Sequence, residues 1–158
     1  MDVETESLES KLQRNLRANL PIYEYMDLRI ESASNGIYRC MVPMIENNMN
    51  HFRTIHAALQ WAAAEVLGGL VWTLSKPEEG DFVPVVRRFE IDFERPAFGD
   101  IVAETRFPKD QSDTMRSELK SKGRYDFVLE SEIRNLDEET LAVGKGFYAI
   151  RESAALRA

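Results

Sequence analysis

Residues 55–74, "IHAALQWAAAEVLGGLVWTL", form the longest apolar segment of this chain. When the segment is projected at about 100° per residue, apolar side chains fall on nearly every side of the resulting helix. A helix that is apolar nearly all round must be buried on nearly all sides. The sequence therefore predicts a central helix over about 55–74 that other parts of the molecule enclose.

Strand patterns dominate the rest of the chain. Alternation of polar and apolar residues between turn signals indicates strands, and these fall in residues 25–33, 36–44, 82–96, 100–107, 125–135 and 140–150. Antiparallel strands around one dominant helix indicate an α+β fold, with a sheet wrapped around that helix. Because the chain has 158 residues and neither a repeat nor a linker, we expect one domain over residues 1–158.

Two further helices are expected. Leu8, Leu12 and Leu16 form one apolar stripe in residues 5–20, which indicates an amphipathic helix. We expect this helix to cover an edge of the sheet; a membrane-surface helix is the alternative, although its polar face mixes both charge signs. A short helix is also expected in the highly charged residues 109–124, with Gly123 near its end.

Composition excludes several classes of protein. The net charge of −7 disfavours nucleic-acid binding, which needs a basic face. The single Cys40 excludes an intramolecular disulfide and a cysteine-based zinc cluster, and it favours a reducing cytoplasm. The acidic start, "MDVETESLES", is unlike a signal peptide. Gln60 and Glu65 interrupt the apolar segment, so we expect no membrane span.

Glu65 is the one carboxylate within the apolar segment. A buried carboxylate requires hydrogen-bond donors, a cation or a raised pKa. Glu65 is therefore a candidate functional residue. The alternative is that it lies at a partly wet edge and makes only a structural hydrogen bond.

The spacing of His56 and Glu65 points to a site between two chains. Glu65 comes nine residues after His56, which places the two on opposite sides of one helix and roughly 13 Å apart along its axis. Across a two-fold interface, the helix N-terminus of one chain could face Glu65 of the other. The small residues Ala57, Ala64 and Gly68 would let a partner backbone approach closely, so we expect a homo-oligomer with two sites per dimer.

The layout and one short motif resemble a known superfamily. A helix wrapped by a curved antiparallel sheet is similar to the hotdog fold. Asn50, then His56 six residues on, then Glu65 nine residues after the histidine resemble the motif of hotdog acyl-CoA thioesterases. The stretch "NHFRTIHAALQWAAAEVLGG" is also similar to a less characterised thioesterase branch of that fold. The resemblance runs from about Ile22 to Arg151.

This resemblance implies roles for four residues. The N–H of Ala57 would bind the thioester carbonyl and stabilise the developing oxyanion. Asn50 would orient a water or bond the thioester. The partner's Glu65 would act as nucleophile or as general base. His56 would hold the loop or support the carbonyl, and the alternative is a structural histidine that bonds nearby backbone.

The motif departs from the family at one point. "HAA" replaces the usual "HGG", and Ala57 stands where a glycine usually begins the helix. Donation by a backbone N–H survives this change, whereas the added Cβ atoms could narrow an acyl channel. We treat His51 as structural, and with only two histidines and no third ligand we expect no metal and no redox cofactor.

Coenzyme A carries phosphates that need local cations. The candidates are Arg87, Arg88, Lys122 and Arg124, with Lys120 in the same basic cluster as the last two. Arg87 and Arg88 are adjacent on a strand and should point to opposite faces. Arg87 is in phase with Phe89, so it would pair with Glu65 or another acid, or reach a rim. The alternative for all of them is a solvated charged surface.

The sequence leaves two functions open and disfavours two others. Hydrolysis of an acyl-CoA or acyl-carrier thioester by a dimer or a dimer of dimers is the first. A non-catalytic protein of the same fold that binds an acyl or CoA ligand is the second. A dehydratase or hydratase is disfavoured because its differently spaced acid–histidine pair is absent, and a transcriptional regulator would need an added DNA-binding domain.

Overall fold

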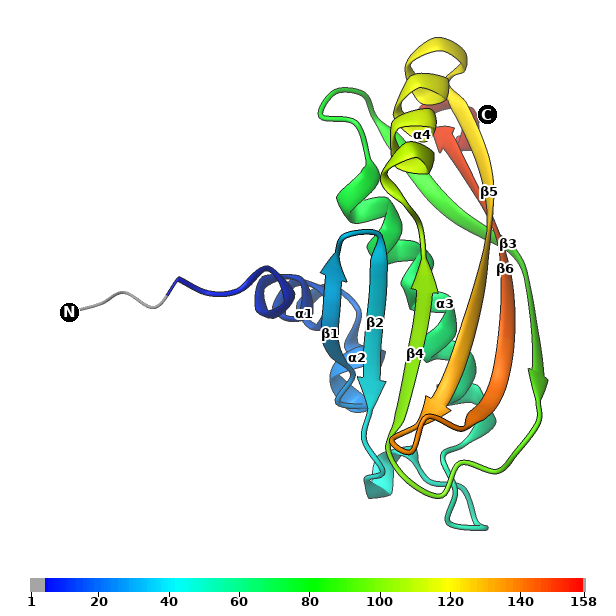
Figure 1. Cartoon of the computed structure of the whole chain (residues 1–158). Coiled ribbons are helices and arrows are strands. Elements are labelled where there is room, and N and C mark those ends of the chain that lie inside the picture. The colour runs from blue at the N-terminus through cyan, green and yellow to red at the C-terminus, as the bar shows by residue number, and fades with distance from the viewer. Residues whose placement is uncertain (1–4, 158) are drawn as a thin grey trace.

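Helix α3 (Ala57–Ser75) lies in the curve of a six-stranded antiparallel sheet (Figure 1). The computed structural model describes residues 5–157. The strand order in the sheet is β1-β2-β4-β5-β6-β3. The expected α+β architecture, a sheet wrapped around one central helix, is confirmed.

The elements follow the order that the sequence pattern predicts. The helices are α1 (Leu8–Asn19), α2 (Pro21–Tyr25), α3, α4 (Lys109–Lys122) and α5 (Ser153–Leu156), with a 3-10 turn at Glu46–Asn48. The strands are β1 (Arg29–Ser34), β2 (Ile37–Val42), β3 (Phe82–Phe93), β4 (Ile101–Arg106), β5 (Arg124–Asn135) and β6 (Thr140–Glu152). All six expected strands are present, while the short helices α2 and α5 were not expected.

The residues that flank helix α3, His56 and Lys76, determine where it begins and ends. His56 has an extended backbone and caps the N-terminus, its side chain accepting a hydrogen bond from the Ala58 N–H. Lys76 leaves the helix at ψ 149°, because the residue before a proline, here Pro77, avoids the helical region. These boundaries lie within two residues of the predicted range of 55–74.

The sheet covers most of α3 but leaves one stripe open. The buried core side chains of α3 include Ala63, Leu67, Leu70 and Val71. The exposed residues recur about every fourth position, and they are Ala57, Ala58, Trp61, Gly69 and Thr73. We call these five residues the open stripe of α3. Such spacing places them on one face of α3. The chain therefore encloses this helix on every side except that face.

Two small residues of α3 have a different role from the one expected. Ala64 is buried within the chain, and a Cβ at Gly68 would lie 2.1 Å from Cε1 of Tyr148 on β6. Gly68 therefore faces the protein's own sheet, Ala64 is enclosed by its own chain, and neither can receive a partner backbone. The prediction that they do was wrong, because helical projection alone cannot tell which of two apolar faces the sheet covers.

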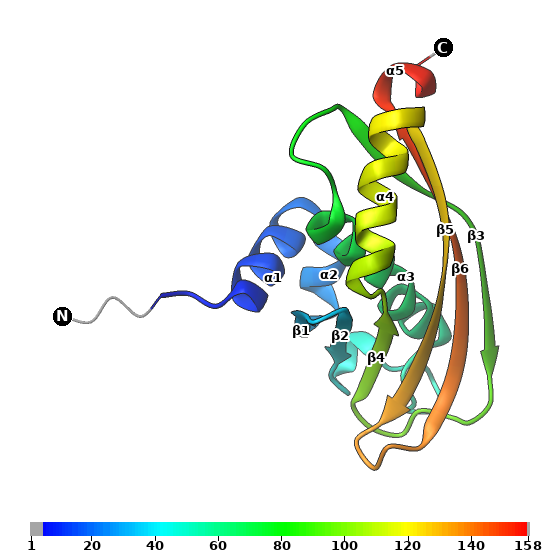
Figure 2. The ribbon, with the colours of Figure 1, turned by 45° about the horizontal axis from the view of Figure 1, so that its top comes forward.

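The first helix covers an edge of the sheet, as expected. Leu12 of α1 is buried, and the Gln13 side chain accepts a hydrogen bond from the Ile30 N–H of edge strand β1 at 3.0 Å. The other edge strand, β3, pairs only with β6 among the described strands. In Figure 2, α4 stands beside α3 and β5, where it closes the far end of the core with the buried Met115 and Leu119.

By length and composition alone, the 19-residue α3 is the one helix of residues 5–157 that could cross a membrane. Ten of its residues are buried inside the domain. Packing against the sheet therefore accounts for its apolar character, as it does for the core helix of many globular folds.

Candidate active site

A tight loop holds Asn50 next to the start of α3. The Asn50 Oδ1 atom accepts hydrogen bonds from the backbone N–H groups of Phe52 and Thr54 at 3.0 and 3.1 Å, and its amide nitrogen donates to Thr54 Oγ1 at 2.9 Å. Arg53 takes a left-handed backbone at φ 59° within this turn. The Asn50 amide thus stabilises its own loop, and one of its two N–H groups remains available for a ligand.

A buried asparagine that the sequence did not single out anchors this loop to the domain. Asn48 is completely buried, and its amide nitrogen donates to the carbonyls of Met26 and Pro43, both at 2.8 Å. The main-chain carbonyl of Asn48 accepts a hydrogen bond from the His56 N–H at 2.8 Å. Asn48 therefore fixes the position of the first turn of α3 relative to the rest of the domain.

The N-terminus of α3 presents one available backbone donor. His56 Nδ1 accepts from the Ala58 N–H at 3.0 Å, and the His56 carbonyl accepts from the N–H groups of Leu59 and Gln60. Within residues 5–157, the N–H of Ala57 donates to no protein acceptor. Ala57 is exposed, so the first N–H of the helix points to an accessible site at the positive end of the helix dipole.

His56 acts as a capping residue in this structure. Its Nδ1 atom is a hydrogen-bond acceptor, which is the state of a neutral ring protonated on Nε2. This is the structural alternative that the sequence left open. A capping role and a supporting role at a bound carbonyl are compatible, because the Nε2 side of the ring takes no part in the cap.

Glu65 lies in the middle of α3, half-buried beside the open stripe. Its Oε2 atom accepts one hydrogen bond, from the Tyr23 hydroxyl of α2 at 3.4 Å. Burial raises the pKa of the Glu65 carboxyl above its usual value, and the Tyr23 hydrogen bond lowers it by a smaller amount. A carboxylate in such a setting is a stronger base than one in water.

A second tyrosine holds the backbone at Glu65. The hydroxyl of Tyr148 on β6 donates to the main-chain carbonyl of Glu65 at 2.9 Å. The Tyr148 ring stacks on Phe127 at 5.1 Å between centroids, and it lies over Gly146 of its own strand. Tyr148 therefore fixes the height of α3 above the sheet at the level of Glu65.

Three of the four motif residues lie in the loop before α3 and in its first turn. Asn50 bonds Thr54 within the loop, His56 caps the helix and Ala57 begins it. Glu65 lies nine residues further along the same helix, too far along the axis to contact them. Sequence spacing missed Tyr23 and Tyr148, because their contacts with Glu65 span 42 and 83 residues and no local pattern signals such pairings.

The two adjacent arginines of β3 do not separate onto opposite faces. A bulge between Val86 and Arg88 shifts the register of β3 against β6, so strict alternation fails there. Arg87 and Arg88 border the same pocket, together with Asp126 and Phe147. The expectation of opposite faces was wrong for this reason.

These arginines already have acidic neighbours. Arg87 lies 3.9 Å from a carboxylate oxygen of Asp126, and Arg88 pairs with Glu90. Both arginines are well exposed, at 64% and 68% of their side-chain surface. Arg87 pairs with Asp126 and not with Glu65 in this structure.

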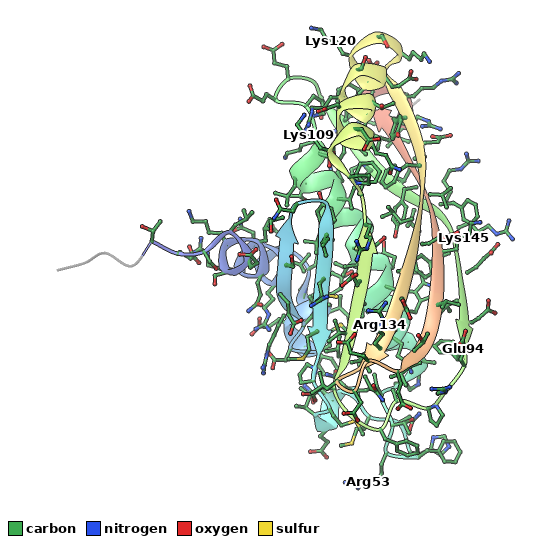
Figure 3. All side chains as sticks on the ribbon, viewed as in Figure 1. Arg53, Glu94, Lys109, Lys120, Arg134 and Lys145 are labelled. Atoms are coloured by element: carbon green, nitrogen blue, oxygen red, sulfur yellow. The ribbon has the colours of Figure 1, made fainter. Side chains whose placement is uncertain are left out.

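The other basic cluster lies far from the motif within one chain. Lys122 pairs with Glu118 at 2.6 Å in the last turn of α4, and Arg124 opens β5. Figure 3 shows Lys120 of this cluster at one end of the domain and Arg53 of the Asn50 loop at the opposite end. Within one chain, Lys122 and Arg124 therefore lie far from the N-terminus of α3.

Comparison with protein families gives one clear result. A family model described as "Putative thioesterase (yiiD_Cterm)" matches residues 9–152. Comparison with curated proteins gives no match.

Solved structures share this fold. A Pseudomonas aeruginosa protein of unknown function, called a probable thioesterase, is 26% identical over 91% of this chain and 96% of its own, with a TM-score of 0.78. A protein of unknown function from Chlorobaculum tepidum is 23% identical over 92% and 95%, with a TM-score of 0.79. A thioesterase from Haemophilus influenzae is 17% identical over 94% and 93%, with a TM-score of 0.72. The fold is the hotdog fold that the sequence predicted.

Proposed function

We propose that this chain, which belongs to the yiiD_Cterm thioesterase family, hydrolyses acyl thioesters, with acyl-CoA as the expected substrate class. The observation that carries the proposal is the available N–H of Ala57 at the exposed N-terminus of α3, which follows the Asn50–Thr54 loop and precedes the half-buried Glu65 on the same helix. Hydrolysis of a thioester needs an oxyanion donor and a base, and these residues supply one of each.

The chemistry follows from these groups. The thioester carbonyl oxygen would accept a hydrogen bond from the Ala57 N–H, where the helix dipole favours the negative charge that develops. The free N–H of the Asn50 amide would orient the carbonyl or the attacking water. A Glu65 carboxylate with a raised pKa would take a proton from that water as it attacks. The thiolate then leaves and takes up a proton; direct attack by the carboxylate is the second route.

A second copy of the chain would complete the site. Trp61 of the open stripe is 36% exposed, and its ring contacts that of Phe89 on β3 at 5.3 Å. The open stripe and the unpaired edge of β3 thus form one continuous face, on which Val86 and Phe93 are also exposed. A long edge strand with free backbone groups favours pairing with another chain. A two-fold pairing on this face would set Glu65 of one chain against Ala57 of the other.

The two alanines after His56 bear on substrate size. Ala57 and Ala58 are both exposed at the start of α3, so their methyl groups would project toward a bound acyl group. Glycine at either position would leave more room. We therefore expect short or slender acyl groups to be preferred over bulky ones.

The pocket between Arg87 and Arg88 is the better candidate for CoA phosphates. Two exposed guanidiniums border one pocket there, and each has N–H donors beyond those that face its acidic neighbour. Lys122 and Arg124 remain the second candidate, since a partner chain could bring them near the site. A cytoplasmic setting belongs to the same proposal, because the only cysteine, Cys40, is a buried free thiol, and no metal or redox cofactor is needed.

The alternative function is that of a binding protein that does not catalyse hydrolysis, and the contacts of Asn50 favour it. The Asn50 side chain is engaged with Thr54 through both its oxygen and its nitrogen, which limits its freedom to orient a water. A binding protein of this fold would still present the Ala57 N–H to an acyl carbonyl. It would form a stable complex with an unreacted thioester.

One experiment separates the two functions. Free-thiol release is measured over a panel of acyl-CoAs, short to long and aromatic, and thermal stability is measured with the same compounds. Thioester hydrolysis predicts turnover of at least part of the panel. A binding protein predicts stabilisation by the thioesters with thiol release at background, and that result would contradict the proposed function.

A further inference from the structure

The short helix α2 turns one tyrosine into the core. Tyr23 is 7% exposed, whereas its neighbours Ile22 and Tyr25 on the same helix are 48% and 54% exposed. Pro21 starts α2 directly after α1 ends, and the Tyr23 carbonyl accepts from the Leu28 N–H at 3.1 Å. Tyr23 is thus the one residue of this five-residue helix that is buried, and the helix directs its side chain into the core.

The buried Tyr23 hydroxyl reaches the Glu65 carboxylate. Its oxygen lies 3.4 Å from Glu65 Oε2, and this is the one hydrogen bond of that carboxylate within residues 5–157. The contact is long, as catalytic hydrogen bonds often are before a substrate binds. The other carboxylate oxygen, Oε1, is left without a protein donor and is free to accept a proton.

We propose that Tyr23 is a positioning residue that holds one oxygen of the Glu65 carboxylate, so that the other oxygen faces the thioester and its attacking water. This inference rests on the proposed function for its catalytic meaning. Tyr23 need not touch the substrate. It would act by fixing the rotamer of Glu65 and by donating to its ionised form.

The surroundings keep Tyr23 in the form that can donate. Burial, and next to it the charge of Glu65, raises the pKa of the Tyr23 hydroxyl far above the neutral range. Tyr23 therefore stays protonated at every pH at which Glu65 titrates. Its hydrogen bond lowers the pKa of Glu65 against the larger effect of burial.

Few other titratable groups approach Glu65. Tyr148 on β6 donates to the Glu65 main-chain carbonyl, and Cys40 on β2 donates to the Ala63 carbonyl at 3.3 Å. Burial raises the pKa of both groups, that of Cys40 to about 12, so both are neutral when Glu65 titrates. The other elements that contact α3 contribute apolar side chains to the shared core. These are Ala103 of β4, Phe127, Leu129 and Ile133 of β5, Met115 and Leu119 of α4, and the partly buried Phe89 of β3. Arg116 of α4 bonds the Ser75 carbonyl at the far end of the helix.

The test compares Tyr23→Phe with Tyr148→Phe. Each variant removes one buried hydroxyl that bonds Glu65, but Tyr23 bonds the carboxylate and Tyr148 bonds the backbone. The pKa of Glu65 is measured in the full-length protein by NMR, with glutamate labelled with ¹³C at the carboxyl and Glu65→Gln used to assign the signal. The pH profile of kcat/KM is measured beside it.

The expected result is a higher pKa of Glu65 in Tyr23→Phe and an unchanged one in Tyr148→Phe. The acidic limb of kcat/KM should move to higher pH in Tyr23→Phe only, and kcat at the plateau should fall roughly tenfold, as for loss of a hydrogen bond to a charged group. An unchanged Glu65 pKa in Tyr23→Phe would overturn the proposal. Equal shifts in the two variants would overturn it as well, because they would reflect general packing.

The two proposals fail in different ways. If the wild-type protein hydrolyses no thioester, the proposed function fails, and the NMR titration still decides whether Tyr23 holds the Glu65 carboxylate. If the wild type is active and Tyr23→Phe has the wild-type Glu65 pKa and pH profile, the proposed function stands and the role of Tyr23 is rejected.

Discussion

The ring of Tyr148 occupies the space in which a side chain at position 68 would lie. A Cβ atom at Gly68 would come within 2.1 Å of Cε1 and 2.3 Å of Cζ of that ring. The ring cannot move aside easily, because it stacks on Phe127 and its hydroxyl bonds the Glu65 carbonyl. The distance between α3 and β6 at this level therefore depends on a glycine.

We predict that Gly68→Ala destabilises the fold. Forcing a methyl group into a packed site typically costs about 1–3 kcal/mol, which exceeds the gain of up to about 1 kcal/mol from the better helix propensity of alanine. Urea unfolding measures the difference in the free energy of unfolding.

Gly69→Ala is the matched control for this change. A Cβ at Gly69 would meet nothing within 4 Å in its own chain, so this variant should be neutral or more stable by up to about 1 kcal/mol. If Gly68→Ala is as stable as Gly69→Ala, the close packing of Tyr148 against Gly68 is not as described.

We predict that Glu65→Gln stabilises the protein, and more so at higher pH. The pKa of Glu65 is raised in the folded state, so the folded chain keeps a proton that the unfolded chain has released. The stability that protonated Glu65 contributes is fully present below the pKa of Glu65 in the unfolded chain. It is lost as the pH rises through the higher pKa of Glu65 in the folded chain. Glutamine does not ionise and avoids this loss.

The measurement is the free energy of unfolding of both proteins from about pH 4 to pH 8. The difference in favour of Glu65→Gln should be small at the acid end and should grow until Glu65 is ionised in the folded state. A difference that shrinks as the pH rises would contradict the raised pKa. It would indicate that a cation or a partner donor stabilises the carboxylate.

The pairing of two chains around each site makes a separate prediction. If Asn50 of one chain works with Glu65 of the other, an Asn50→Ala chain mixed with a Glu65→Gln chain forms heterodimers with one intact site. We expect each parent to be nearly inactive and the mixture to recover up to about one quarter of wild-type turnover, because half of the random dimers carry one of two sites. Absence of recovery, with heterodimers demonstrated by differently tagged chains, would exclude a site shared in this way.

The fold was predictable because its signals are local. The apolar segment around Ala63 and Leu67 requires enclosure, and period-two alternation around Phe89 and Ile91 marks a half-buried strand. Each pattern can be read from a short window of sequence. Helix α2 was missed because Pro21 divides what looks like one helical run, and five residues are too few to show a period.

The candidate site was predictable only in part. Asn50, His56 and Ala57 lie close in sequence, in the loop before α3 and in its first turn, so their spacing carries the prediction. The contact of Tyr23 with Glu65 exists only because α2 packs over α3, and no sequence window contains both. Arg87 was placed on the wrong face because a bulge in β3 changes the alternation, and nothing in the sequence marks that bulge.

The most direct test of the account is thiol release from the acyl-CoA panel by the wild type and by Glu65→Gln, side by side and at a pH where Glu65 is ionised. Loss of a general base typically lowers the rate about 10²- to 10⁴-fold. We therefore predict that the wild type turns over part of the panel and that the rate of Glu65→Gln is lower by at least a hundredfold. The variant should fold and assemble as the wild type does. Equal turnover by the two proteins would contradict the catalytic role of Glu65 and with it the mechanism proposed for this site.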